Sequence, residues 1–127
     1  MNFFGKRVLF LGAHPDDIEL GCGALLHHIV KETDVLCVTL SDNQKNPDLK
    51  QVRNEHIRSM KILGVPEEKV VFGTFQTRVF PDARQEILEY FLKLRKAAKY
   101  RLPYALIAPG QFMCLAEQML SAAPMIY

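Results

Sequence analysis

Residues 7–23 of this chain read Arg-Val-Leu-Phe-Leu-Gly-Ala-His-Pro-Asp-Asp-Ile-Glu-Leu-Gly-Cys-Gly. The apolar run at residues 8–11 is typical of a buried β-strand, and the apolar residues that follow position 17 recur at helical spacing. The short loop between these segments carries His14, Asp16 and Asp17. The stretch therefore predicts a strand, a polar loop and a helix, which is the repeating unit of an α/β fold.

The polar loop lies where such folds place their ligands. In an open α/β sheet, ligands bind beside the carboxyl ends of the strands. One imidazole and two carboxylates at that place can hold a divalent metal and still leave one carboxylate to transfer protons. The alternative is structural, because Asp16 or Asp17 can cap the helix by accepting a backbone N–H, with His14 an ordinary surface residue. Capping explains one aspartate and leaves the second aspartate and the histidine unexplained.

Strand and helix patterns alternate along the rest of the chain. We expect strands at residues 7–12, 35–40, 70–72 and 104–108, and helices at residues 17–31, 49–63 and 82–100, the last capped by Asp82. A polar loop is expected at residues 41–48, and residues 75–80 are expected to be irregular. This order predicts an α/β fold, a Rossmann-like three-layer sandwich whose mostly parallel sheet has about four to five strands, with the first strand placed centrally.

Length and composition indicate one ordinary globular domain over residues 1–127. Of the 127 residues, 49% are hydrophobic and 24% are charged, which is enough apolar material for a core. The formal charge of +2 is too small to indicate nucleic-acid binding. No apolar run approaches the roughly 20 residues that span a bilayer. Three widely spaced cysteines without a C-x-x-C motif favour a reduced, cytoplasmic protein with Cys37 in its core.

Two segments of the chain resemble a known family. Residues 13–23, Ala-His-Pro-Asp-Asp-Ile-Glu-Leu-Gly-Cys-Gly, resemble the opening motif of the PIG-L/LmbE family of zinc-dependent de-N-acetylases. Residues 53–55, Arg-Asn-Glu, followed by Ile-Leu-Gly-Val at residues 62–65, are similar to a helix of that family. The resemblance covers about residues 6–109. It implies a hydrolase that removes the acetyl group from a small N-acetylglucosamine-type sugar.

The same resemblance implies roles for individual residues. His14 and Asp17 would be ligands of Zn²⁺ or another divalent metal, and Asp16 would be the general base. Such a metal lowers the pKa of water, and a carboxylate that is not a ligand can then accept the proton. Arg53 is a candidate substrate contact because a guanidinium suits hydroxyl, carboxylate or phosphate oxygens, and it can equally pair with a neighbouring acid. Asp42 follows the second strand and either lines the same crevice or serves as a turn residue.

The resemblance ends after Pro109. In the family, a His-x-Asp-His segment after the fourth strand supplies the third metal ligand and a histidine that helps stabilise the oxyanion. That segment should fall near residues 115–118, yet residues 110–127 contain no histidine. We therefore expect the N-terminal part of the family fold, followed by a divergent tail at residues 110–127.

The remaining histidines are poor substitutes for the missing ligand. His27 and His28 lie about 15 Å along the helix from the motif, and His56 is expected in mid-helix, beside an acid. Cys114 and Glu117 are the plausible replacements near the correct strand end. Apolar side chains in the tail also fit a homo-oligomer contact.

Two functions are consistent with these patterns. The first is a metal-dependent de-N-acetylase. The second is a catalytically impaired remnant that acts as a binding or assembly module, because loss of one oxyanion donor typically lowers a rate by about 10²–10³. A mononucleotide-binding Rossmann domain is a distant third alternative, since the first loop lacks G-x-G-x-x-G and its carboxylates would repel phosphate.

Overall fold

The fold comes from a computed structural model that describes residues 7–97 and 105–107. The expectations for Cys114, Glu117 and the apolar tail fall outside these residues, so they stay predictions. So do the expected end of the last helix near residue 100 and both flanks of the fourth strand.

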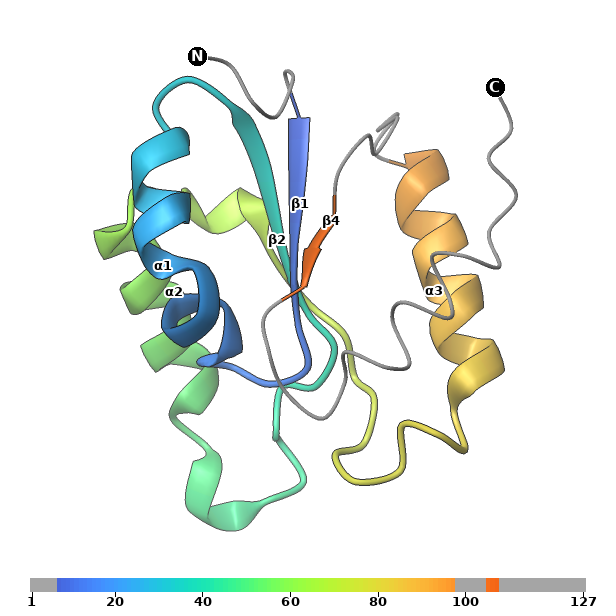
Figure 1. Ribbon diagram of the computed structural model, residues 1–127. Helices are drawn as coiled ribbons and strands as arrows, with labels where there is room; N and C mark the ends of the chain where they lie inside the picture. The colour runs from blue at the N-terminus through green and yellow to red at the C-terminus, as the bar shows by residue number, and fades with distance from the viewer. Residues whose placement is uncertain (1–6, 98–104, 108–127) are drawn as a thin grey trace.

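Four parallel strands form one sheet in the described part of the chain, in the order β3-β2-β1-β4 (Figure 1). These strands are β1 (Arg7–Gly12), β2 (Asp34–Thr39), β3 (Val70–Phe72) and β4 (Ala105–Ile107). β1 pairs with β2 along its whole length and with β4 on its other side. The first strand is therefore central, as the sequence predicts, and its carboxyl end opens between two neighbours.

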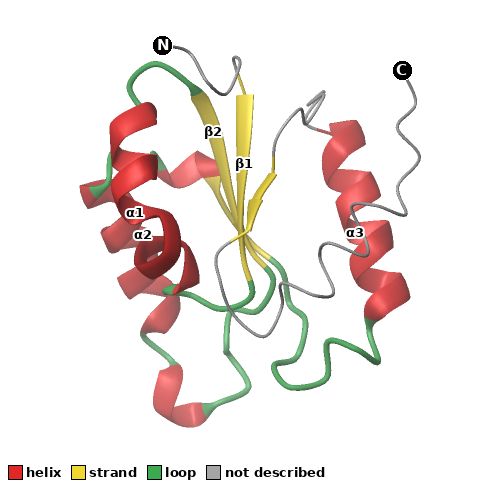
Figure 2. Cartoon of the chain, viewed as in Figure 1, coloured by secondary structure: helices red, strands yellow, loops and turns green. Residues whose placement is uncertain are grey.

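Helices cover both faces of this sheet (Figure 2). They are α1 (Asp17–Ile29), α2 (Val52–Ile62) and α3 (Arg84–Ala97). α1 and α2 lie on one face and α3 lies on the other, which makes the three layers of the predicted α/β sandwich. None of these described helices is both long and apolar enough to cross a bilayer.

Two helix starts differ from the sequence prediction because turn chemistry decides them. α2 begins at Val52 and not at residue 49, since Pro47–Leu49 forms a separate 3-10 turn capped by the side chain of Asn46. α3 begins at Arg84, because residues 81–83 form a turn. The N–H of Ala83 donates to the carbonyls of Val79 and Phe80, which precede this turn. Ala83 thus precedes the helix, and the predicted cap at Asp82 is wrong.

Two apolar clusters hold the helices against the sheet. Alternate residues of β1 enter different clusters, Val8 and Phe10 on the side of α1 and α2, Leu9 and Leu11 on the side of α3. This is the arrangement expected of parallel strands that are buried on both faces. Cys37 is fully buried in the cluster that contains Val8 and Phe10, and burial raises the pKa of its thiol to about 12. The thiol is therefore a core group, as predicted.

Gly73 allows the chain to pass closely where β3 ends. A Cβ atom at this position would lie 2.5 Å from the carbonyl oxygen of Leu40, a backbone atom that cannot easily move. We predict that Gly73→Ala lowers the free energy of unfolding, measured with urea, by about 1–3 kcal/mol.

Gly23→Ala is the matched control for this prediction. Its new Cβ would meet Leu63 Cδ1 at 3.8 Å, which is an ordinary contact. Because Gly23 lies inside α1, alanine is expected to stabilise that helix by about 0.5–1 kcal/mol. Equal stabilities of the two variants would contradict this account of the packing at Gly73.

Candidate metal-binding and catalytic site

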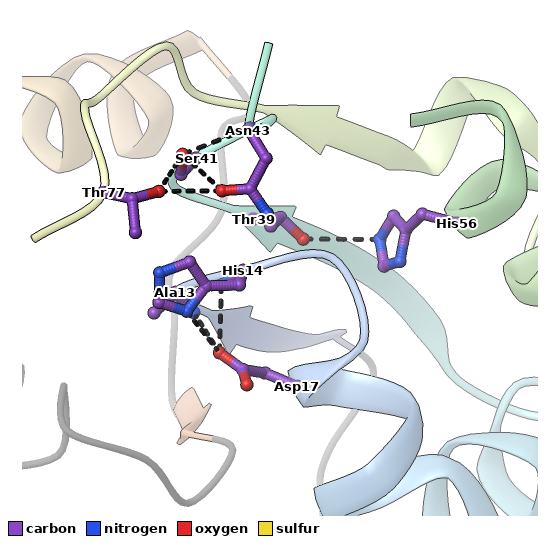
Figure 3. Close-up of polar contacts among 8 residues, drawn as sticks. All are labelled: Ala13, His14, Asp17, Thr39, Ser41, Asn43, His56 and Thr77. Carbon is purple, nitrogen blue, oxygen red and sulfur yellow. Dashed lines mark hydrogen bonds and ion pairs between the residues drawn. The ribbon is translucent and has the colours of Figure 1, made fainter. Parts of the chain in front are cut away.

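The loop that leaves β1 is closed by the carboxylate of Asp17. This residue begins α1, and its Oδ2 accepts hydrogen bonds from the N–H of Ala13 (3.0 Å) and of His14 (2.9 Å) (Figure 3). We call these two hydrogen bonds the Asp17 latch. The carbonyls of Gly12 and Ala13 in turn accept the N–H groups of Leu40 and Ser41. The loop is thereby fixed both to its own helix and to the segment that leaves β2.

Asp16 has a strained backbone within this loop. Its φ is 125° and its ψ is −25°, a region that residues other than glycine rarely adopt. Its side chain is exposed and makes no capping hydrogen bond within the described residues. The carboxylate of Asp17 bonds to N–H groups that precede the helix, not to those inside it. The capping interpretation is therefore wrong for both aspartates, and strain of this kind clusters at functional loops.

His14 places its imidazole between the latch and an aromatic ring. Its Nδ1 lies 3.6 Å from Asp17 Oδ2, and its ring centroid lies 5.7 Å from that of Phe80. Its Nε2 is buried and has no hydrogen-bond partner among the residues that the structure describes. Buried polar atoms in native proteins nearly always have a partner. The imidazole therefore offers a free coordinating or hydrogen-bonding position.

The donors at this loop fit part of a zinc site. Histidine nitrogen and aspartate oxygen bind zinc at about 2.0–2.2 Å, so two ligands of one tetrahedral ion lie about 3.4 Å apart. The observed separation of His14 Nδ1 and Asp17 Oδ2 is 3.6 Å. Within residues 7–97 and 105–107, no group of three or more His, Cys, Asp or Glu side chains could hold a metal. The described residues thus supply two donors, whereas catalytic zinc sites usually have three.

The two aspartates of the loop differ in acidity. Partial desolvation of the otherwise exposed Asp16 carboxyl by the surrounding loop, followed by the negative charges of Asp17 and Glu19, raises its pKa above the usual value. Burial acts in the same direction on Asp17, but the imidazole and N–H of His14 and the N–H of Ala13 together hold its pKa below the usual value. Adjacent carboxyls whose pKa values are pushed apart are suited to different roles in acid–base chemistry.

A cleft of about 500 Å³ opens beside His14. The loops that leave β2 and β3 line it, with residues 41–47 on one side and residues 74–78 on the other. It lies at the carboxyl ends of parallel strands, where α/β sheets bind ligands, and its volume is typical of small-molecule sites. Half of its lining residues carry hydroxyl or amide side chains, and Pro47, Leu49 and Phe75 add apolar surface. The cleft therefore offers hydrogen-bonding groups beside apolar ones, a combination that suits a small polar ligand.

Three polar side chains tie the two cleft loops together (Figure 3). Ser41 Oγ lies 3.0 Å from Thr77 Oγ1, and Thr77 Oγ1 donates to Asn43 Oδ1 at 2.7 Å. Asn43 has a φ of 56°, which asparagine tolerates better than most residues. None of these residues was singled out from the sequence. The polar composition after the second strand signals Ser41 and Asn43, and the rule that ligands bind at strand ends could have drawn attention to Thr77.

Arg53 and Asp42, the two predicted substrate contacts, pair with each other. Arg53 Nη1 lies 3.6 Å from Asp42 Oδ2, and the guanidinium lies 4.6 Å from the centroid of the Phe72 ring. The acid that Arg53 meets thus comes from the loop after β2 and not from its own helix. Asp42 both lines the cleft and accepts the N–H of Gln44 in a turn, so its two proposed roles coexist.

The other histidines lie apart from this loop or are held by their own partners. His27 and His28 are exposed near the far end of α1, and His27 Nδ1 lies 3.1 Å from the carbonyl of Leu63. His56 is buried and lies within hydrogen-bond distance of Glu19. Of the predicted site residues, His14 and Asp42 line the cleft, whereas Asp16, Asp17 and Arg53 are not among the residues that line it.

The sequence matches one protein family and a curated protein named as a deacetylase. Residues 9–109 match the GlcNAc-PI de-N-acetylase family, PIG-L. Over 61 residues the chain is 43% identical to the uncharacterized deacetylase YaiS of Escherichia coli strain K12, a match that covers 46% of this chain and 33% of YaiS. The chain thus spans about a third of the length of this curated relative.

Two solved structures share the fold. The conserved protein TT1542 from Thermus thermophilus has a TM-score of 0.55 at 23% identity, over 69% of this chain and 42% of that protein. The N,N'-diacetylchitobiose deacetylase from Pyrococcus horikoshii, solved with its inhibitor MPG, has a TM-score of 0.54 at 21% identity, over 71% of this chain and 38% of that enzyme. At these identities the likeness establishes the fold alone.

The Asp17 latch predicts a pH dependence of stability. Because the pKa of folded Asp17 lies below its ordinary value of 3.8, the ionised carboxylate stabilises the fold above that pH. This contribution is lost as the pH falls through the folded pKa. We predict that Asp17→Asn lowers the free energy of unfolding by about 1–3 kcal/mol at neutral pH, and that its difference from the wild type shrinks below about pH 4. Urea denaturation of both proteins across this pH range measures the difference in their free energies of unfolding. A difference that does not change with pH would exclude a role for the charge of Asp17.

Proposed function

Because the chain belongs to the GlcNAc-PI de-N-acetylase family, PIG-L, we propose that it is a metal-dependent amide hydrolase that removes the acetyl group from an N-acetylated amino sugar. The observation that carries the proposal is the loop after β1, at the carboxyl end of the central strand. There Nδ1 of the His14 imidazole lies 3.6 Å from Oδ2 of Asp17, a separation that suits two ligands of one ion.

In the proposed mechanism, His14 and Asp17 would hold Zn²⁺ or another divalent cation. When bound, such a cation lowers the pKa of water and polarises a carbonyl oxygen. Asp16 is held apart from the latch and accepts the proton of the attacking water, and it then returns the proton to the nitrogen of the leaving amine. A carboxylate that is not a metal ligand can act first as a base and then, once protonated, as an acid.

The cleft beside His14 is the proposed binding site for the sugar. Its hydroxyl and amide side chains can exchange hydrogen bonds with sugar hydroxyls, and the Ser41–Asn43–Thr77 contacts preform one wall. Asp42, which lines the cleft, would accept a hydrogen bond from the same ligand, and Arg53, which pairs with Asp42 outside this lining, would donate one at the rim. The disaccharide named for the structural neighbour from Pyrococcus horikoshii supports a small acetylated sugar as the substrate class. The free thiols of Cys22 and Cys37 support a cytoplasmic location.

A second candidate function is a binding module without turnover. It is favoured by the donor set, since the described residues supply two metal ligands where a catalytic zinc site usually has three. Such a module would bind the sugar, the cation or both through the same loop and cleft.

Amine release from N-acetylglucosamine derivatives in the presence of zinc tests the proposal. We predict that Asp16→Asn lowers kcat by about 10²–10⁴ because it removes the proton acceptor, while zinc binding persists. His14→Gln is expected to lose zinc binding and activity together. His28→Gln, at the exposed far end of α1, is the matched control and should behave as the wild type.

The outcomes separate the two candidates. Zinc bound through His14 without amine release from any derivative would favour the binding module. A chain that neither binds zinc nor releases amine would contradict the metal-dependent hydrolase. An Asp16→Asn variant with unchanged kcat would remove Asp16 from the mechanism.

A further inference from the structure

A buried chain of hydrogen bonds joins three elements behind the candidate site. His56 lies in α2, and its Nδ1 donates to Oε1 of Glu19, in the first turn of α1, across 2.6 Å. Its Nε2 lies 3.3 Å from Oγ1 of Thr39, the last residue of β2 (Figure 3). We call these two contacts the His56 strut. A carboxylate can only accept, so the short contact requires the proton to be on Nδ1.

Burying the side chains of the His56 strut costs free energy, so we expect the strut to serve the geometry around it. The His56 side chain is 1% exposed and that of Glu19 is 17% exposed, while Thr39 is fully buried. Desolvating an imidazole and a carboxylate is unfavourable, and apolar residues of similar volume often stabilise a protein equally well or better. The His56 ring also packs edge-to-face with the ring of Phe72, the last residue of β3, with centroids 5.3 Å apart. One side chain thus touches the ends of two strands and the start of α1.

Because Thr39 is fully buried, the residues of the strut cannot act as a catalytic triad. Thr39, His56 and Glu19 follow the order of nucleophile, base and acid that hydrolases use. A nucleophile must reach a substrate, however, and Thr39 has no exposed surface. The strut therefore acts on its surroundings and not on a ligand.

The His56 strut lies next to Asp16, the strained residue of the candidate site, in the chain segment that begins α1. Asp16 keeps a φ of 125°, and such a conformation persists only when both flanks over-determine it. The Asp17 latch fixes the backbone on the strand side of Asp16. On the helix side, Leu20 N–H donates to the carbonyl of Asp16, and Glu19 is anchored to His56. The latch and the strut thus act from opposite sides.

We infer that His56 is a positioning residue: through Glu19 and Thr39 it fixes the first turn of α1 against the end of β2 and holds Asp16 in its positive-φ conformation. The structural part of this inference stands on the folded chain alone. Its kinetic consequence, a loss of kcat with little change in KM, rests on the proposed function.

The test compares local and global opening of the chain. His56→Leu removes both ring nitrogens at similar volume, and His56→Asn keeps an N–H donor in the place of Nδ1. Met60→Ala is the matched control, because Met60 is fully buried one turn further along α2 and lies outside the strut. Hydrogen exchange of the latched amides of Ala13 and His14 is compared with that of core-strand amides, which open only on global unfolding.

In His56→Leu, we expect protection of the latched amides to fall about tenfold more than protection of the core amides. The coupling between the amide and α protons of Asp16, which depends on φ, should change in the same variant. His56→Asn keeps the contact with Glu19 but not the one with Thr39, so it should recover part of both observables. In Met60→Ala, latched and core amides should lose protection in parallel. If His56→Leu does not fold, Glu19→Met cuts the same hydrogen bond from its less buried end, with Glu19→Gln as its conservative partner.

Parallel loss of protection in His56→Leu, with an unchanged Asp16 coupling, would reduce His56 to a packing residue and overturn the inference. A wild type that releases no amine would instead remove the proposed function, while the exchange comparison would still decide the role of the strut. With an active wild type, a fall in kcat in His56→Leu that His56→Asn partly restores supports positioning. Unchanged kcat in His56→Leu would contradict it.

Discussion

Two backbone N–H groups, those of Ala13 and His14, converge on one oxygen of Asp17, and the geometry of the loop follows from that contact. To receive both hydrogen bonds, the carboxylate must turn back from the first residue of α1 toward the end of β1. The chain then has to reverse between His14 and Asp17, and Asp16 takes up the strain of that reversal as a positive φ. The exposed Asp16 and the constrained Asp17 are therefore two results of one turn. This explains why a single capping aspartate would not build the same loop.

The sheet supplies the second half of the site. Parallel strands end at the same edge, so the loops after β1, β2 and β3 meet there although they are distant in sequence. Contacts between these loops are dense: Leu40 and Ser41 donate to the loop after β1, and Phe75 donates to the carbonyl of Leu40. These contacts between loops fix the walls of the cleft, as is usual for small-molecule sites that are largely preformed.

Patterns local in the sequence predicted the architecture well, and pairings across elements escaped them. The central position of β1, the three layers and the buried Cys37 follow from apolar runs and from the alternation of strands and helices. The starts of α2 and α3 were wrong, because a 3-10 turn at Pro47 and a turn before Arg84 compete with helix formation. The Glu19–His56 contact depends on how α1 and α2 pack, and no spacing encodes it. His56 therefore looked like an ordinary mid-helix residue.

The proposed function requires His14 to bind a cation at the carboxyl end of the central strand. Nuclear magnetic resonance of the imidazole nitrogens during a zinc titration addresses this most directly, because the chain has four histidines and each gives its own signals. We predict that zinc shifts the ring nitrogens of His14 and leaves those of His27, His28 and His56 in place. Zinc that moves the signals of another histidine, or of none, would contradict this claim.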